Sequence, residues 1–308
     1  MSYLHILINS LQNLVIPKHL FVRFIFSDNA STDGSYETLT QANLNNKTVF
    51  LQEKDIGGWG NINFLLNKIQ SEYFMFIDGH DYISKFYLED FYNNVTLQSD
   101  NTAYIGNVIT LQEEKGKFYP INIQQNYEFA RFRNIRNLQL SVFLFHNSIY
   151  HAIFPTRQVN MGALNKSKSW SLDHLITHAG LANCKLKYLD KSFYMRRYRE
   201  IFGGDFTHYV SGELITRRQR GLGNINLSIN DMNIAEEIVE LLDYGNYIVK
   251  ILVKLFINGK FRKSRLSFLI YRIARFVANK ILRANPLNSE IKSVPKEVYD
   301  DIIVFENI

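Results

Sequence analysis

Short apolar runs alternate with polar turns and helix-like segments through the first two hundred residues of the chain. The runs are rich in aromatic and β-branched residues, which favours strands over helices. We expect strands at residues 20–26, 47–54, 73–78, 103–112 and 148–155. Between them, apolar side chains from Ile62 to Ile69 recur at the spacing of one helix face, and residues 87–98 are predicted to form another helix.

Strand–helix alternation of this kind predicts an α/β fold, with a mostly parallel sheet flanked by helices. In such sheets, ligands bind beyond the carboxyl ends of the strands. Asp28 and Asp78 both lie at predicted strand ends. After about residue 200 the pattern becomes loop-like and then helical, so we divide the chain into a domain at 1–200 and a mainly helical, basic region at 201–308.

Composition narrows the class of protein. With 308 residues and 46% hydrophobic content, the chain can form one large core or a main domain with a smaller one. Its single cysteine, Cys184, excludes a disulfide framework and fits a reducing compartment. The sequence has no apolar run of membrane-spanning length and no basic segment that would mark a signal peptide. We expect a cytoplasmic protein, free or peripheral on the cytoplasmic face of the inner membrane.

The net charge of +6 is concentrated near the C-terminus. No acidic residue lies between Asp243 and Glu290, where ten basic residues are interleaved with aliphatic and aromatic ones. A helix at residues 246–284 with this pattern suits an anionic membrane surface. The alternative is a packed helical subdomain with a solvated basic face. We expect no nucleic acid, because no recognition motif accompanies the charge.

Four local features carry candidate chemistry. The first is Asp28 in "SDNASTDGS", where a strand-end carboxylate precedes a turn and a helix. It can contact a ligand, or the turn can simply cap the helix through Ser31, Thr32 or Asp33.

The second feature is "EKDIGGWGNIN" at residues 53–63. Paired glycines before a helix allow close backbone approach and expose a helix N-terminus, which suits phosphate. A plain glycine-rich turn is the alternative.

The third feature is Asp78-Gly79-His80-Asp81, which ends an apolar run. Carboxylate and imidazole groups suit a divalent metal, and a histidine favours Mn²⁺ over Mg²⁺. The alternative is a capped strand end with a solvated histidine.

The fourth feature is Asp173 in "SWSLDHLITHAG", at the start of a predicted helix. It can serve as a general base, or it can merely stabilise the helix dipole.

Taken in order over residues 4–200, these features resemble the inverting family 2 glycosyltransferases of the GT-A fold. "FIFSDNASTDGSYETL" is similar to the family's strand-end acid and its turn. "EKDIGGWGNINFLLNKIQSEYFMFIDGHDYI" is similar to the segment that leads into the D-x-D motif. "WSLDHLITHAGLANCKLKYLDKSFYMRRYRE" is similar to the region of the catalytic carboxylate.

The resemblance implies a nucleotide-diphosphate sugar as donor, with a UDP-sugar as the expected form, and a Mn²⁺ or Mg²⁺ cofactor. Asp173 would deprotonate an acceptor hydroxyl, which attacks the anomeric carbon opposite the departing nucleoside diphosphate. The donor site would comprise Asp28, Asp55, Asn63, Asp78 and Asp81.

His80 departs from the family, which usually has an aspartate there. The D-x-H form resembles that of the polypeptide N-acetylgalactosaminyltransferases, which share the fold and use manganese. The implied metal ligands are Asp78, His80 and His208.

A second departure lies at the N-terminus, where residues 2–17 resemble the helix that follows the family's first strand. The first strand is therefore expected to be missing, so that the chain is a shortened form or another segment completes the sheet.

The function implied is metal-dependent transfer of a sugar, with inversion, to a glycan or lipid-linked glycan in bacterial surface polysaccharide biosynthesis. The alternative is a non-catalytic relative that acts as a membrane- or partner-binding module.

Overall fold

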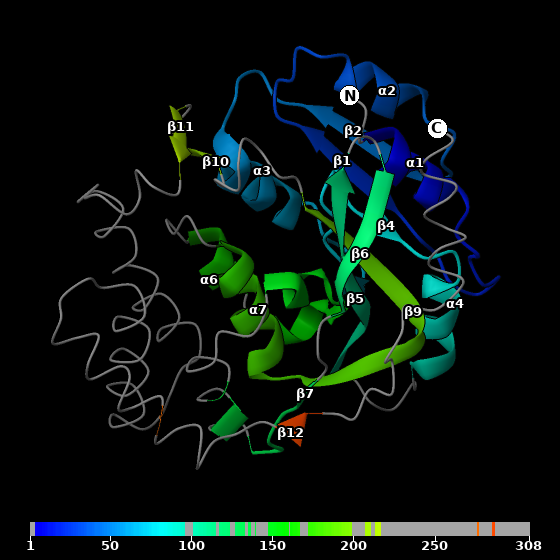
Figure 1. The fold of residues 1–308 in the computed structure, drawn as a ribbon, viewed down its shortest axis with the longest axis vertical. Helices are drawn as coiled ribbons and strands as arrows, with labels where there is room; N and C mark the ends of the chain where they lie inside the picture. Colours follow the sequence, from blue (N-terminus) through cyan, green and yellow to red (C-terminus); the bar gives the residue numbers. More distant parts are fainter. Residues whose placement is uncertain are drawn as a thin grey trace, which may run out of the picture.

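The structure is a computed structural model in which helices and strands alternate (Figure 1). It describes residues 4–95, 101–114, 117–123, 127–132, 135–136, 139, 147–159, 161–166, 172–198, 207–210, 213–216, 276 and 285–286. The expected α/β class is confirmed.

The N-terminal elements are α1 (Leu4–Gln12), β1 (Phe24–Asp28), α2 (Ser35–Gln41), β2 (Lys47–Leu51) and α3 (Gly57–Leu66). Strands β1 and β2 pair in parallel, from Phe24 opposite Lys47 to Asp28 opposite Leu51. The first strand begins later than predicted, because the Leu20 amide donates to the Pro17 carbonyl in a turn. The pairing of β1 with β2 extends to Asp28, so this residue is the last of the strand.

The largest sheet has the strand order β4-β9-β5-β6. Its strands are β4 (Tyr82–Ile83), β5 (Thr102–Glu114), β6 (Lys117–Ile123) and β9 (Lys185–Tyr198). Only β5 and β9 run parallel within it, whereas β4–β9 and β5–β6 are antiparallel. The described sheets are thus mixed, where the sequence predicted a mostly parallel one. For β5 and β6 the cause is the short connection, which permits only an antiparallel hairpin.

The region predicted as strands 73–78 and 148–155 is the clearest correction to the sequence-based elements. Only β3 (Tyr73–Phe74) and β8 (Phe154–Pro155) are strands, and they pair antiparallel. The residues before β8 form a 3-10 helix, η1 (Asn147–His151), closed by the Ala152 amide donating to the Ile149 carbonyl. As a result, a side chain of η1 rather than a neighbouring strand meets the Phe76 carbonyl.

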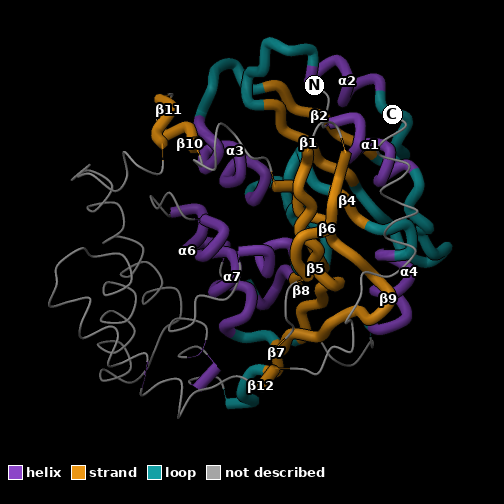
Figure 2. The backbone as a smooth tube through the Cα atoms, in the orientation of Figure 1, coloured by secondary structure: helices purple, strands orange, loops and turns teal. Residues whose placement is uncertain are grey.

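The remaining described elements surround these sheets. They are α4 (Tyr87–Asn94), β7 (Tyr127–Glu128), η2 (Thr156–Gln158), α6 (Met161–Lys166), α7 (Leu172–Ala182), β10 (Thr207–Val210), β11 (Glu213–Thr216) and β12 (Asn285–Pro286). Figures 1 and 2 show α6 and α7 to the left of the four-stranded sheet and α4 to its right. Strands β10 and β11 form a hairpin, and β12 pairs with β7.

The predicted C-terminal helices, including the basic segment 246–284, lie outside the described residues apart from Phe276. The boundary at residue 200 stays a prediction. Within the part of the chain that is described, no helix has the length and apolar character needed to cross a membrane.

One large hydrophobic core joins the elements around the site. It is made of side chains from α1, α3, α4, β3, β5, η1, β8, α7 and β9, and includes Leu7, Leu66, Phe74, Tyr87, Ile105, Phe154, Leu175 and Tyr194. Tyr194 and Phe154 have no exposed surface. The residues that flank the Asp78–Asp81 loop are therefore held by the main core.

Candidate functional site

The loop after β3 carries two carboxylates, of which one enters the interior. Residues 75–78 continue past β3 without a strand partner among the described residues, and the Asp81 amide donates to the Asp78 carbonyl at 3.0 Å. That turn places Asp81 inside, with 1% of its side chain exposed, and leaves Asp78 at the surface with 36% exposed. One carboxylate is thus buried and the other lies at the mouth of the same site.

Two buried tyrosines donate hydrogen bonds to these carboxylates. The Tyr150 hydroxyl, from η1, donates to Asp78 Oδ2, and the Tyr194 hydroxyl, from β9, donates to Asp81 Oδ2 at 2.5 Å. Burial raises the pKa of both phenols well above the usual value, and the neighbouring carboxylates raise it further. Both hydroxyls therefore keep their protons and serve as donors.

His151, the last residue of η1, completes the group. Its side chain is fully buried between the rings of Tyr150 and Tyr194, with ring centroids 3.7 and 4.1 Å away. Its Nδ1 lies 2.7 Å from the Phe76 carbonyl oxygen. Burial lowers the pKa of the imidazole to about 4 against the opposing effect of Asp78, so the ring is neutral at pH 7.

Asp78, Asp81 and His151 each offer one ligand atom, and these atoms lie within 4.8 Å of one another. Two carboxylate oxygens and an imidazole nitrogen suit Mn²⁺ better than Mg²⁺. The residues present therefore fit the divalent cofactor expected from the sequence. His151 was missed there because residues 148–155 were assigned to a strand. The available signal was a histidine inside an apolar run, which needs a buried polar partner.

His80, predicted as a metal ligand, lies on the outer side of this group. Its side chain is 54% exposed, and its Nε2 is 3.6 Å from Asp81 Oδ1. His208 lies on β10 opposite Ile215. The structure thus brings together Asp78 and Asp81 with His151, and both predicted histidine ligands stay predictions.

Asp28 ends β1 and Asp55 lies just before α3, and Asn29 ties these two segments together. The Asn29 side-chain amide donates to Asp55 Oδ1, and its oxygen accepts from the Ile56 amide at 3.0 Å. Asp55 Oδ1 also accepts from the Gly57 amide at 2.7 Å, where a positive φ of 73° favours glycine. Asn29 therefore fixes Asp55 relative to the end of β1.

Asp28 is 5% exposed, and its Oδ1 accepts from the Ser31 amide at 2.7 Å. The cap of α2 is Gly34, without a side-chain cap bond, and Asp33 Oδ1 accepts from the Ser35 amide at 3.1 Å. The hydrogen bond from the Ser35 hydroxyl is the main reason why the pKa of Asp33 falls to about 2. Asp33 therefore has a structural role in this turn, whereas Asp28 is a buried acid at the end of the strand.

Asn63 lies on α3, and its side-chain oxygen is buried without a hydrogen-bond partner within the described residues. Its neighbour Asn61 instead donates to the Ser27 carbonyl at 2.9 Å. Asp173 is the second residue of α7. The donor-binding role of Asn63 and the catalytic role of Asp173 stay predictions.

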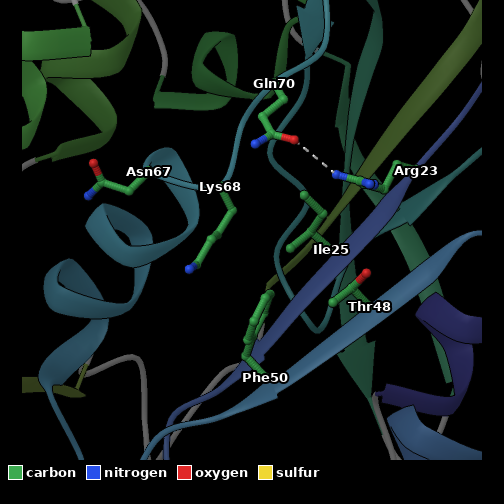
Figure 3. A pocket seen from close by; sticks show the side chains of 7 residues that line it. All are labelled: Arg23, Ile25, Thr48, Phe50, Asn67, Lys68 and Gln70. Atoms are coloured by element: carbon green, nitrogen blue, oxygen red, sulfur yellow. Dashed lines mark hydrogen bonds between the residues drawn. The ribbon is translucent and has the colours of Figure 1, made fainter.

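A separate small pocket of about 210 Å³ lies at the other end of β1. Figure 3 shows Arg23 directed toward Gln70, with Lys68 opposite and Phe50 on the floor. The Lys68 ammonium lies 5.1 Å from the Phe50 ring centroid and 4.9 Å from that of Phe64. Because Arg23 precedes β1 and Asp28 ends it, this basic pocket lies at the opposite end of the strand from Asp28.

Comparison with known proteins identifies a family that the chain matches. Residues 2–154 match the profile described as glycosyl transferase family 2. This segment is a family 2 glycosyl transferase domain. The family expected from the ordered motifs is thereby confirmed.

Among curated relatives, this family 2 chain is similar to the "Glycosyltransferase GlyA" of Streptococcus pneumoniae, with 21% identity over 197 residues. That match covers 62% of this chain and 28% of the relative, so the chain spans little more than a quarter of that protein.

Solved structures of S. aureus TarS residues 1–349 share the fold. The complex with UDP has a TM-score of 0.56 at 21% identity, covering 86% of this chain and 70% of that TarS fragment. A second structure of the same fragment has a TM-score of 0.56 at 18% identity, covering 98% of this chain and 74% of the fragment. The likeness confirms the expected GT-A type of fold.

Proposed function

We propose that the protein is a metal-dependent glycosyltransferase that moves a sugar from a nucleotide-diphosphate donor to a glycan or lipid-linked glycan, with inversion. The observation that carries the proposal is the meeting of Asp78, Asp81 and His151 at the end of β3 in a family 2 chain. A buried carboxylate–imidazole group of this kind suits a divalent cation that faces a diphosphate.

The donor is proposed to be a UDP-sugar. TarS, which shares the fold, has been solved in complex with UDP and with UDP-GlcNAc. In this chain, Asp28 and Asp55 would bind the base and ribose, and Asn29 holds their two loops together. Asn63 offers a buried side-chain oxygen nearby on α3.

The leaving group would be bound at the loop after β3. A divalent cation bound there would neutralise charge on the departing diphosphate. Asp78 and Asp81 would hold it, and the Tyr150 and Tyr194 hydroxyls orient these carboxylates by donating to them. The sequence-predicted ligands His80 and His208 are the alternatives to His151 as the nitrogen ligand of this cation.

The base is proposed to be Asp173, in the first turn of α7. Its carboxylate would take the proton of the acceptor hydroxyl as that oxygen bonds to the anomeric carbon. The bond from this carbon to the diphosphate oxygen breaks on the opposite face, which inverts the anomeric configuration.

The activity is tested by incubating the full chain with a panel of UDP- and GDP-sugars plus Mn²⁺ and measuring donor hydrolysis and transfer. Turnover of at least one donor is expected. If no donor turns over and calorimetry detects no nucleotide binding, the protein is instead a non-catalytic relative that binds a membrane or a partner.

The base is tested by Asp173→Asn, which should lower transfer roughly 10²- to 10⁴-fold while UDP affinity stays within about threefold of wild type. Asp190→Asn, at an exposed position of β9, is the matched control and should behave as wild type. Unimpaired transfer by Asp173→Asn would remove this residue from its proposed role.

The acceptor is proposed to reach the enzyme at a membrane surface, as the basic segment 246–284 suggests. A cytoplasmic or peripheral location on the inner membrane, and a role in bacterial surface polysaccharide assembly, follow from the same reasoning. These proposals rest on charge pattern and family.

A further inference from the structure

The histidine between the two aspartates is not the imidazole that faces both of them. Asp78 and Asp81 come from the loop after β3, whereas His151 comes from η1, far along the chain. The ligand atoms that lie within 4.8 Å of one another belong to Asp78, Asp81 and His151.

We propose that His151, rather than His80, is the nitrogen ligand of a divalent cation held with Asp78 and Asp81. The inference rests on the metal-dependent transfer proposed above, but it concerns cation binding and can be tested without turnover.

The hydrogen bonds of His151 identify its tautomer. Nδ1 lies 2.7 Å from the Phe76 carbonyl oxygen, which only accepts hydrogen bonds, so Nδ1 carries the proton. The Nε2 atom then presents a lone pair. An imidazole held by a backbone carbonyl at one nitrogen and free to coordinate with the other is the usual arrangement of a metal-binding histidine.

The surroundings of Nε2 consist of groups rich in negative charge. Asp81 Oδ2 lies 3.6 Å away and Asp78 Oδ2 lies 3.9 Å away. The Tyr194 hydroxyl is 3.1 Å from Nε2, but it is 2.5 Å from Asp81 Oδ2, to which it gives its one proton. His151 Nε2, Asp78 Oδ2 and Asp81 Oδ2 therefore lie close together with lone pairs available. Such a group is favourable when a positive ion lies among the three atoms.

The separations are compatible with one ion. Two ligand atoms that each lie about 2.1 Å from a cation are roughly 3.0 Å apart at a right angle and roughly 4.2 Å apart when opposite. The separations of 3.6 and 3.9 Å fall between these limits. These separations allow His151 to share a cation with either carboxylate.

His80 is placed differently. With 54% of its side chain exposed, it approaches Asp81 through Oδ1, the oxygen of that carboxylate that does not face His151. An imidazole in this position can bind solvent or substrate without approaching Asp78.

The experiment uses the full chain and Mn²⁺ alone, with binding followed by electron paramagnetic resonance. His151→Gln should weaken Mn²⁺ binding by at least ten- to a hundredfold, since even residues that only support metal ligands have effects of this size. His80→Gln is the matched control and should bind Mn²⁺ within about threefold of wild type.

Pulsed measurements on the same samples detect nitrogen that is directly bonded to manganese. Wild type and His80→Gln should both show imidazole ¹⁴N coupling, and His151→Gln should not. Because the wild-type spectrum is informative alone, the test survives a His151→Gln protein that fails to fold. A wild-type protein that binds no Mn²⁺, or binds it without ¹⁴N coupling, overturns the inference, as does coupling lost only in His80→Gln.

The two proposals fail in different ways. Mn²⁺ coupled to His151 in a protein that hydrolyses no donor contradicts the transferase but supports the ligand. Donor turnover with Mn²⁺ that shows no nitrogen coupling contradicts the ligand alone.

Discussion

Asp81 is a nearly buried carboxylate, and the Tyr194 hydroxyl beneath it satisfies one of its oxygens. Buried ionised groups are costly unless paired, so this hydrogen bond is part of what allows the acid to sit in the core. The same reasoning applies to Asp78, which receives the Tyr150 hydroxyl. The two tyrosines thus explain how acidic groups can end an apolar strand.

Cys184 offers a residue-level prediction on pH. The side chain has no exposed surface, and burial raises the pKa of its thiol to about 12 from an ordinary 9. The folded state therefore disfavours the thiolate, and this contribution to stability is complete below pH 9 and lost as pH rises toward 12. At pH 8 the native protein should react with a thiol reagent only as fast as it unfolds.

The measurement is labelling of the native protein by a chromogenic disulfide at pH 8, with and without urea. Labelling in urea should be faster by several orders of magnitude, and Cys184→Ser should give no signal in either condition. Rapid stoichiometric labelling of the native protein would show that the thiol is accessible.

Among single residues, the sequence singled out Asp78 and Asp81, which the structure brings together, but it did not single out His151, which lies beside them. Asp28, Asp78 and Asp81 could be singled out because acidic residues directly after an apolar run can be recognised in the sequence itself. For His151 the only local signal was a histidine inside an apolar run, and that signal does not identify its partner, because the partner is the Phe76 carbonyl that η1 meets in the fold. A contact between residues so far apart in sequence leaves no local pattern.

Among the elements, α7 and β8 pack with no spare volume. A Cβ built on Gly180 of α7 would lie 2.3 Å from Phe154 Cε1, and the Phe154 ring is fully buried in β8. This contact joins the helix that carries Asp173 to the segment that carries His151. The helix that carries the proposed base is therefore packed directly against the segment that carries the proposed metal ligand.

Gly180→Ala should force α7 away from β8. We expect a loss of about 1–3 kcal/mol in the free energy of unfolding, typical of an overpacked core, together with reduced transfer. Urea denaturation and the donor assay measure the two effects.

Gly58→Ala is the control, because a Cβ at that position of α3 meets no atom within 4 Å. Its stability should be unchanged or slightly higher, since alanine favours a helix by up to about 1 kcal/mol. Equal stability of the two variants would show that Phe154 yields easily.

The prediction of elements succeeded where the pattern was long and failed where it was short. Residues 103–112 became most of β5, because a long run of β-branched and aromatic residues has no competing structure. Residues 73–78 yielded only the two residues of β3, and beyond it the Phe76 carbonyl meets the His151 side chain instead of a strand. Local sequence cannot distinguish these partners.

At the scale of the whole molecule, the parallel pairing of β5 with β9 connects two halves of the described domain. Its register begins with Thr102 opposite Lys185 and shifts once, between Gly106 and Asn107. Family and fold could be predicted because several motifs occur in order, whereas this register depends on contacts between distant segments. The mixed character of the sheets follows from the same distant contacts.

The charge distribution gives a prediction for the whole chain. Ten basic and no acidic residues between Asp243 and Glu290 should bind vesicles that contain anionic lipid. Replacing Lys250, Lys254, Lys260, Arg262 and Lys263 with glutamine should lower binding at least tenfold in a sedimentation assay. Adding salt should weaken wild-type binding as well.

Replacing Lys185, Lys187 and Lys191 of β9, which are exposed, removes positive charge elsewhere and serves as the control. If both sets of substitutions weaken binding equally, the attraction depends on net charge and not on the basic segment.

The contact between Gly180 and Phe154 also limits how this sequence can diverge. Any side chain at position 180 overlaps an aromatic ring at position 154, so the two sites are not free to change independently. In descendants of this chain, a larger residue at 180 should appear only after a smaller one has arisen at 154. The pair should therefore evolve as a unit, with the two substitutions arising in that order.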